Sequence, residues 1–199
     1  MKFIKHTGTA VPLCIDNIDT DQLIPKQYLK GTEKTGYADA LFDTWRYDEN
    51  GDPVAEFPLN RPEYRNASLL IAGDNFGCGS SREHAAWALQ DYGFRVVIAG
   101  SFSPIFYMNW LNNGNLPIQL PKRDRDALAA LPPETEMEVD LQEQKLRAGG
   151  KVYSFELDAA WKERLLTGRD AIDLTLDFET EISAYEKKNP YWQGGCHAG

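Results

Sequence analysis

A short segment near the middle of the chain gathers residue types that bind and transform small anions. Residues 77–84 read GCGSSREH, so the hydroxyl groups of Ser80 and Ser81 and the guanidinium of Arg82 follow two closely spaced glycines. A guanidinium holds a carboxylate or phosphate through paired hydrogen bonds. The segment therefore indicates an anion site.

The residues on either side predict elements that would favour anion binding at this segment. Residues 68–73 (SLLIAG) and 94–100 (FRVVIAG) are apolar runs typical of buried parallel strands. The apolar positions between them recur at helical spacing, at Ala85, Ala88, Leu89 and Tyr92. Strand, helix and strand form a βαβ unit, and open α/β sheets bind ligands where such a loop enters a helix N-terminus. Anions are attracted there, and Gly77 and Gly79 would let backbone amides approach a ligand closely.

The same residues admit a purely structural interpretation. Ser80 and Glu83 have the S-x-x-E spacing of a capping box, in which Ser80 would cap the helix and the glycines would only form the turn. Two familiar phosphate-binding loops are excluded: the chain has no Gly-Lys-Ser/Thr, and Arg82 stands where the dinucleotide fingerprint requires its third glycine.

The remaining pattern predicts a mixed α/β domain with a parallel βαβ core and an antiparallel hairpin. A helix should open at Ser103, followed by a strand over residues 115–121 and a short helix over residues 123–132. Alternation on both sides of residues 148–151 (AGGK) predicts the hairpin. Beyond it we expect a helix, a strand or extended piece, and a final helix.

The length suits a single domain over residues 1–199. Residues 28–66 are dense in Gly, Pro, Asn and Asp, and long irregular connections are often functional or mobile. We therefore expect an irregular substrate-specificity segment there, which could act as a lid. The glycine-rich residues 190–199 predict a flexible tail.

Charge and cysteine usage exclude several classes of protein. The net charge of −9 and the lack of a basic stripe disfavour binding to nucleic acid or anionic membranes. Cys14, Cys78 and Cys196 are odd in number and far apart, which favours a reducing compartment over a disulfide framework. The sequence contains no apolar run that suits a signal peptide or a membrane span. We expect a cytoplasmic protein.

Two motifs together carry a family resemblance. Residues 73–85 (GDNFGCGSSREHA) and 17–25 (NIDTDQLIP) resemble the paired signatures of the aconitase superfamily's swivelling domain. HTGTAVPL, YGFRVVIAGSFSPIFYMN and AYE near the end are similar to the branch formed by 3-isopropylmalate dehydratase (isopropylmalate isomerase) small subunits. The resemblance extends over nearly the whole chain. It implies a mixed β/β/α swivelling domain and a hydro-lyase that converts 2-isopropylmalate to 3-isopropylmalate in leucine biosynthesis.

The resemblance also implies roles for the motif residues. Ser80 would be the base that takes a proton from carbon, Arg82 a carboxylate clamp, and Ser81 a hydrogen-bonding partner of the substrate. Asp21 would orient the site by pairing with Arg82. The alternative is that Asp19, Thr20 and Asp21 form only a local turn, which is the role expected for Asp19.

The segment around YLKGTEKTG corresponds to the family's substrate-selecting loop. Tyr28 and Leu29 could line an apolar pocket for the isopropyl group, or could be ordinary core residues.

In this superfamily a 4Fe–4S cluster held by three cysteines supplies the Lewis acid. The three cysteines here include no close-spaced pair, so we expect this chain to bind no metal and the cluster to lie in a separate large subunit. Alone, the chain should be inactive. Two alternatives remain open, namely a small subunit acting on citraconate or homoaconitate, and a non-catalytic anion-binding module.

Overall fold

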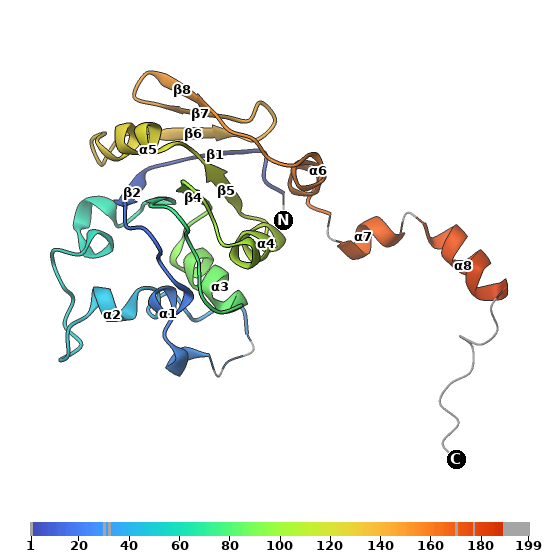
Figure 1. Cartoon of the computed structure of the whole chain (residues 1–199), viewed down its shortest axis with the longest axis horizontal. Helices are drawn as coiled ribbons and strands as arrows, with labels where there is room; N and C mark the ends of the chain where they lie inside the picture. The colour runs from blue at the N-terminus through green and yellow to red at the C-terminus, as the bar shows by residue number, and fades with distance from the viewer. Residues whose placement is uncertain (1, 30, 32, 170, 177, 189–199) are drawn as a thin grey trace, which may run out of the picture.

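Two stacked β-sheets and a layer of helices form the body of the molecule (Figure 1). The computed structural model describes residues 2–29, 31, 33–169, 171–176 and 178–188. An antiparallel four-stranded sheet lies against one face of a parallel four-stranded sheet, and α3 and α4 cover the other face. The predicted β/β/α arrangement is therefore confirmed.

The parallel sheet separates two hydrophobic cores. Its strand order is β2 (Ala10–Leu13), β3 (Leu69–Ala72), β4 (Val96–Ala99), β5 (Leu116–Gln119). Leu70 and Val97 face the core shared with the helices, whereas Leu69 and Val96 face the core shared with the antiparallel sheet. Successive side chains of a strand point to opposite faces, so a sheet covered on both faces needs unbroken apolar runs. This is why the two runs beside the glycine loop predict the βαβ unit correctly.

The antiparallel sheet contains the predicted hairpin. Its strand order is β1 (Lys5–Gly8), β6 (Met137–Asp140), β7 (Lys145–Ala148), β8 (Lys151–Ser154). The turn between β7 and β8 consists of Gly149 and Gly150, with φ of 54° and 75°. Two consecutive left-handed residues match the right-handed twist of a two-residue hairpin. The N-terminal strand β1 pairs with β6 and then runs directly into β2, so it joins the two sheets.

The main helices agree with the sequence pattern at most positions. They are α3 (Glu83–Tyr92), α4 (Pro104–Asn112), α5 (Lys122–Ala129), α6 (Ala159–Thr167), α7 (Ala171–Leu176) and α8 (Glu179–Lys188). The prediction of a strand or extended piece between α6 and α8 is wrong, because helix α7 lies between them. A short apolar run with alternating polarity fits either state, and local pattern alone cannot separate them. In Figure 1, α7 and α8 extend away from the sheets. No helix in the described ranges is long and apolar enough to cross a membrane.

The described residues in the range 26–66 form short helical turns joined by irregular chain. The turns are η1 (Lys26–Tyr28), α2 (Asp43–Arg46), η2 (Pro58–Asn60) and η3 (Pro62–Tyr64). Arg46 is only 8% exposed. Its guanidinium donates to the carbonyl oxygens of Ala38 (3.0 Å) and Leu41 (3.2 Å) and to the side chain of Asn60 (3.3 Å). One buried cation therefore ties several parts of this segment together. The tail expected over residues 190–199 lies outside the described residues.

Candidate active site

The glycine-rich loop after β3 packs against a short helix from the N-terminal motif, α1 (Thr20–Leu23). Asp19 caps this helix: its carboxylate accepts the Gln22 amide at 2.8 Å, and the Gln22 side chain accepts the Asp19 amide at 2.8 Å. This reciprocal pair fixes the start of α1. Asp19 therefore acts in local structure, as the turn interpretation of this residue anticipated.

Backbone hydrogen bonds join the two motifs directly. The Thr20 amide donates to the carbonyl oxygen of Cys78 at 2.9 Å, and the Gly77 amide donates to that of Ile18 at 2.8 Å. The Gly77 amide is therefore occupied and cannot approach a ligand, contrary to our expectation. Gly77 has another reason to be glycine, because φ is +73° and a Cβ would lie 2.3 Å from the ring of Phe106. The loop is held in shape by α1 on one side and by α4 on the other.

Ser80 does not cap helix α3, so the proposed capping box is wrong. The helix begins at Glu83, and its N-cap residue is Arg82, which makes no side-chain capping bond. The Ser80 main chain is bound elsewhere: its amide donates to the Thr20 hydroxyl at 3.1 Å, and its carbonyl oxygen accepts the Arg82 amide at 2.9 Å. The Ser80 side chain is exposed, and no group in the described part of the chain hydrogen-bonds its hydroxyl. The hydroxyl is therefore available for chemistry.

Glu83 is turned toward the neighbouring helix. Its carboxylate accepts hydrogen bonds from the Trp87 indole at 3.3 Å and from the Asn113 side-chain amide at 3.1 Å. A carboxylate engaged in this way cannot reach back to complete a capping box. Its contacts instead join the start of α3 to the end of α4.

Arg82 and Asp21 form an ion pair between the two motifs, which confirms the expected pairing. The Arg82 side chain is 11% exposed, whereas that of Asp21 is 49% exposed. The hydrogen bond from Arg82 holds the pKa of Asp21 below its ordinary value, and the positive charges of Arg82 and Lys26 act in the same direction. Asp21 therefore remains ionised at neutral pH and fixes one side of the guanidinium. No other acceptor among the described side chains engages this guanidinium, so its remaining N–H groups can bind a carboxylate.

The start of α3 adds a second source of positive potential beside Ser80 and Ser81. No acceptor within the described ranges reaches the amide N–H groups of Ser81, Glu83 and His84. Free amides at a helix N-terminus carry the positive end of the helix dipole and bind anions. Ser81 is exposed at this position. Asp21, Ser80 and Ser81 are exposed, and the more buried Arg82 joins Asp21 to the loop. This arrangement is suited to holding a carboxylate beside a free hydroxyl.

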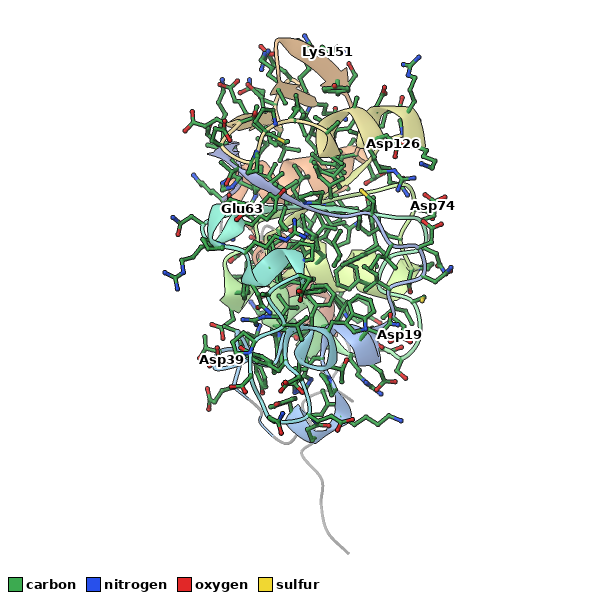
Figure 2. The ribbon with its side chains drawn as sticks, turned by 90° about the vertical axis from the view of Figure 1, so that its left-hand side faces the viewer. Asp19, Asp39, Glu63, Asp74, Asp126 and Lys151 are labelled. Carbon is green, nitrogen blue, oxygen red and sulfur yellow. The ribbon has the colours of Figure 1, made fainter. Side chains whose placement is uncertain are left out.

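Tyr28 and Leu29 lie in different surroundings from each other. The Tyr28 hydroxyl donates to Asp43 at 3.1 Å, and burial together with this carboxylate raises the pKa of Tyr28. Tyr28 lines an open cavity of about 720 Å³ whose other walls include the acidic residues Asp39, Asp43, Asp48 and Glu49. Leu29 is half-buried and packs against the core beneath the parallel sheet. Figure 2 shows Asp39, one of the wall residues of this cavity, at the edge of the molecule opposite Asp19. A role for Tyr28 and Leu29 in selecting the substrate stays a prediction.

Two side chains of α3, His84 and Asp91, hold Gly31 and residues 36–38 through hydrogen bonds that the sequence did not reveal. His84 Nε2 donates to the carbonyl oxygen of Gly31 at 3.0 Å. At the other end of the helix, one carboxylate oxygen of Asp91 accepts the amides of residues 36–38 at 2.7, 2.7 and 3.1 Å. The apolar spacing predicted the helix that contains His84 and Asp91. Nothing in the sequence shows what these two side chains contact. The expected substrate-selecting loop is therefore attached to the helix that begins at the candidate site.

The described residues do not fit a three-cysteine iron–sulfur cluster. Cys14 is exposed after β2, whereas Cys78 is half-buried with its sulfur 3.5 Å from the carbonyl oxygen of Asn17. Burial and the charge of Asp19 raise the pKa of Cys78, which disfavours the thiolate that a metal ligand requires. No group of three His, Cys, Asp or Glu side chains in the described ranges could hold a metal ion. Cys196 lies outside those ranges.

Comparisons with known proteins show the family to which this chain is similar. The chain matches the Aconitase C-terminal domain family over residues 1–123. A 3-isopropylmalate dehydratase small subunit of Streptococcus sanguinis is 56% identical over 196 residues, covering 96% of this chain and 99% of that protein. One from Limosilactobacillus fermentum is 53% identical over 191 residues, covering 96% and 98%.

A solved structure gives the same result at lower identity. The crystal structure of the 3-isopropylmalate dehydratase LeuD from Methanocaldococcus jannaschii superposes with a TM-score of 0.65 at 28% identity, covering 92% of this chain and 99% of that chain. Similarity of sequence and fold thus extends over nearly the full length of these relatives. The chain belongs to the family of 3-isopropylmalate dehydratase small subunits, built on the aconitase C-terminal domain.

Proposed function

We propose that this chain is the small subunit of a hydro-lyase that converts 2-isopropylmalate to 3-isopropylmalate in leucine biosynthesis. The reaction removes water from the substrate and adds it back with the opposite regiochemistry. One observation carries the proposal for the site: an unengaged Ser80 hydroxyl lies at the positive end of α3, beside the Arg82–Asp21 pair.

The chain's own residues would bind the substrate and move a proton. Arg82, held by Asp21, binds a substrate carboxylate, and Ser81 adds a hydrogen bond. Ser80 Oγ accepts the proton that leaves carbon during dehydration. For this the hydroxyl must first give its own proton to solvent water, to which it is exposed, and this loss is made easier by the helix N-terminus and the nearby guanidinium. Rehydration then returns a proton to the neighbouring carbon.

The exposure of this region supports dependence on a partner. Ser80 and Ser81 lie at the surface, whereas charge stabilisation is strongest in a site from which water is excluded. A large subunit that covers the loop would create such a site. We place the 4Fe–4S cluster in that subunit, where it would supply Lewis-acid chemistry to the departing hydroxyl group. We also propose that the assembled enzyme works in the cytoplasm, where cysteines stay reduced.

Reconstitution tests the proposal. The chain and its large subunit are purified separately, then each alone and both together are assayed with 2-isopropylmalate, citraconate and homoaconitate. We expect turnover only in the mixture, with 2-isopropylmalate as the preferred substrate. Turnover by the isolated chain would contradict the division of roles, and preference for citraconate or homoaconitate would contradict the assigned substrate.

A further inference from the structure

A buried threonine from the N-terminal motif contacts the main chain of the candidate base. Thr20 is 2% exposed, although threonine is mostly found at protein surfaces. Its hydroxyl accepts the Ser80 amide at 3.1 Å, and its own amide donates to the Cys78 carbonyl oxygen at 2.9 Å. Two hydrogen bonds from one residue therefore span residues 78–80 of the loop.

The loop is shaped to let this hydroxyl approach. Gly79 lies between the two bonded positions, with φ of +94°, and a Cβ there would lie 3.2 Å from the Thr20 hydroxyl oxygen. Only glycine adopts such a conformation without strain, and a Cβ there would crowd the threonine oxygen. The second glycine of GCGSS is therefore matched to Thr20 rather than to a ligand.

The result is a serine whose main chain is fixed while its side chain is left free. Thr20 engages the Ser80 amide, and the Arg82 amide engages the Ser80 carbonyl oxygen. Without the first bond, the peptide preceding Ser80 could rotate, and the hydroxyl would move with it. Misplacement of a reacting group by about 1 Å can cost on the order of 100-fold in rate.

We propose that Thr20 is a positioning residue that sets the orientation of Ser80 for proton transfer. The inference rests on the proposed function, because it requires Ser80 to be the base. Thr20 itself does not contact substrate, since its hydroxyl is buried behind the loop. Its hydroxyl, and not its bulk, is the group that matters.

Matched substitutions in the reconstituted two-subunit enzyme test this role. Thr20→Val keeps the shape and removes the hydroxyl, and we expect kcat to fall about 30-fold while KM changes less than about threefold. Thr20→Ser restores the hydroxyl and should recover most of kcat. Thr7→Val is the control, because it replaces a hydroxyl by a methyl group at an exposed position of β1. This variant should retain wild-type kcat.

A second measurement follows the hydrogen bond itself. In the isolated full chain, amide exchange at Ser80 monitored by NMR should become about tenfold faster in Thr20→Val and remain unchanged in Thr20→Ser. If Thr20→Val fails to assemble, Thr20→Ala removes the same hydroxyl and carries the same two expectations. Wild-type kcat and unchanged Ser80 exchange in either variant would overturn the inference.

Ser80→Ala, measured in parallel, separates the two levels of the proposal. If Ser80→Ala is inactive and Thr20→Val has full kcat, Thr20 has no positioning role but Ser80 remains the base. If Ser80→Ala keeps full activity, the proposed function of Ser80 fails, whatever Thr20 does.

Discussion

Replacing Asp21 by asparagine removes the charge that holds Arg82 while keeping the volume of the side chain. The ion pair joins the two signature motifs, and the Arg82 side chain is only 11% exposed. In the variant, a largely buried guanidinium keeps its charge but loses its carboxylate partner. We expect Arg82 to reorient toward solvent or toward other acceptors, so that the carboxylate clamp is no longer aligned with Ser80.

The expected loss of stability is small and the expected loss of activity is large. The Asp21 side chain is 49% exposed, so solvent screens the pair and its removal should lower the free energy of unfolding by about 1 kcal/mol. For a chain of this length, that change lowers Tm by about 2–4 °C. A misaligned clamp should lower kcat/KM about 100-fold, equivalent to about 2.7 kcal/mol of transition-state stabilisation.

Thermal unfolding of the isolated chain and steady-state kinetics of the reconstituted enzyme measure the two effects. Asp126→Asn is the matched control, because Asp126 pairs with Lys122 on the exposed surface of α5. Because solvent screens this exposed pair, its loss should leave both Tm and kcat/KM unchanged. If Asp21→Asn gives the same kinetics as Asp126→Asn, the reasoning about the clamp is refuted.

Two further perturbations test the packing around the site and the joint between the sheets. Burial, aided by the charge of Arg95, lowers the pKa of His6. The free energy of unfolding should therefore be highest above the ordinary histidine pKa of about 6.5 and should decrease as the pH drops toward the lower pKa of the folded chain. Urea unfolding at pH 7.5 and at pH 5.5 measures this decrease, and His6→Gln should make it smaller. Gly77→Ala forces a Cβ to within 2.3 Å of the Phe106 ring at a φ of +73°, which should cost about 2–4 kcal/mol. A Tm for Gly77→Ala equal to that of the wild-type chain would show that the loop adapts freely.

The βαβ core could be predicted because its signal is local and redundant. Both strands are apolar runs buried on two faces, and the helix between them shows one apolar face. Long-range contacts reinforce these local preferences rather than oppose them. The pairing of Asp21 with Arg82 was also expected, but from the family resemblance and not from the spacing of the residues.

The start of α3 was predicted wrongly because a distant residue decides it. Ser80 and Glu83 have the spacing of a capping box, yet Thr20 takes the Ser80 amide and α4 takes the Glu83 carboxylate. The attachment of residues 36–38 to Asp91 is equally invisible in the sequence, since a carboxylate on a helix surface is usually solvated. Sequence pattern predicts elements well, whereas the contacts that shape this site join segments far apart in the chain.

The most direct test of the central claim is the isomerase activity of Ser80→Ala in the assembled two-subunit enzyme. The Ser80 hydroxyl makes no hydrogen bond within the described part of the chain, so its removal should leave Tm and subunit assembly unchanged. We predict that kcat falls by about three orders of magnitude or more, as expected when a general base is lost. A variant that assembles normally and keeps wild-type kcat would contradict the account.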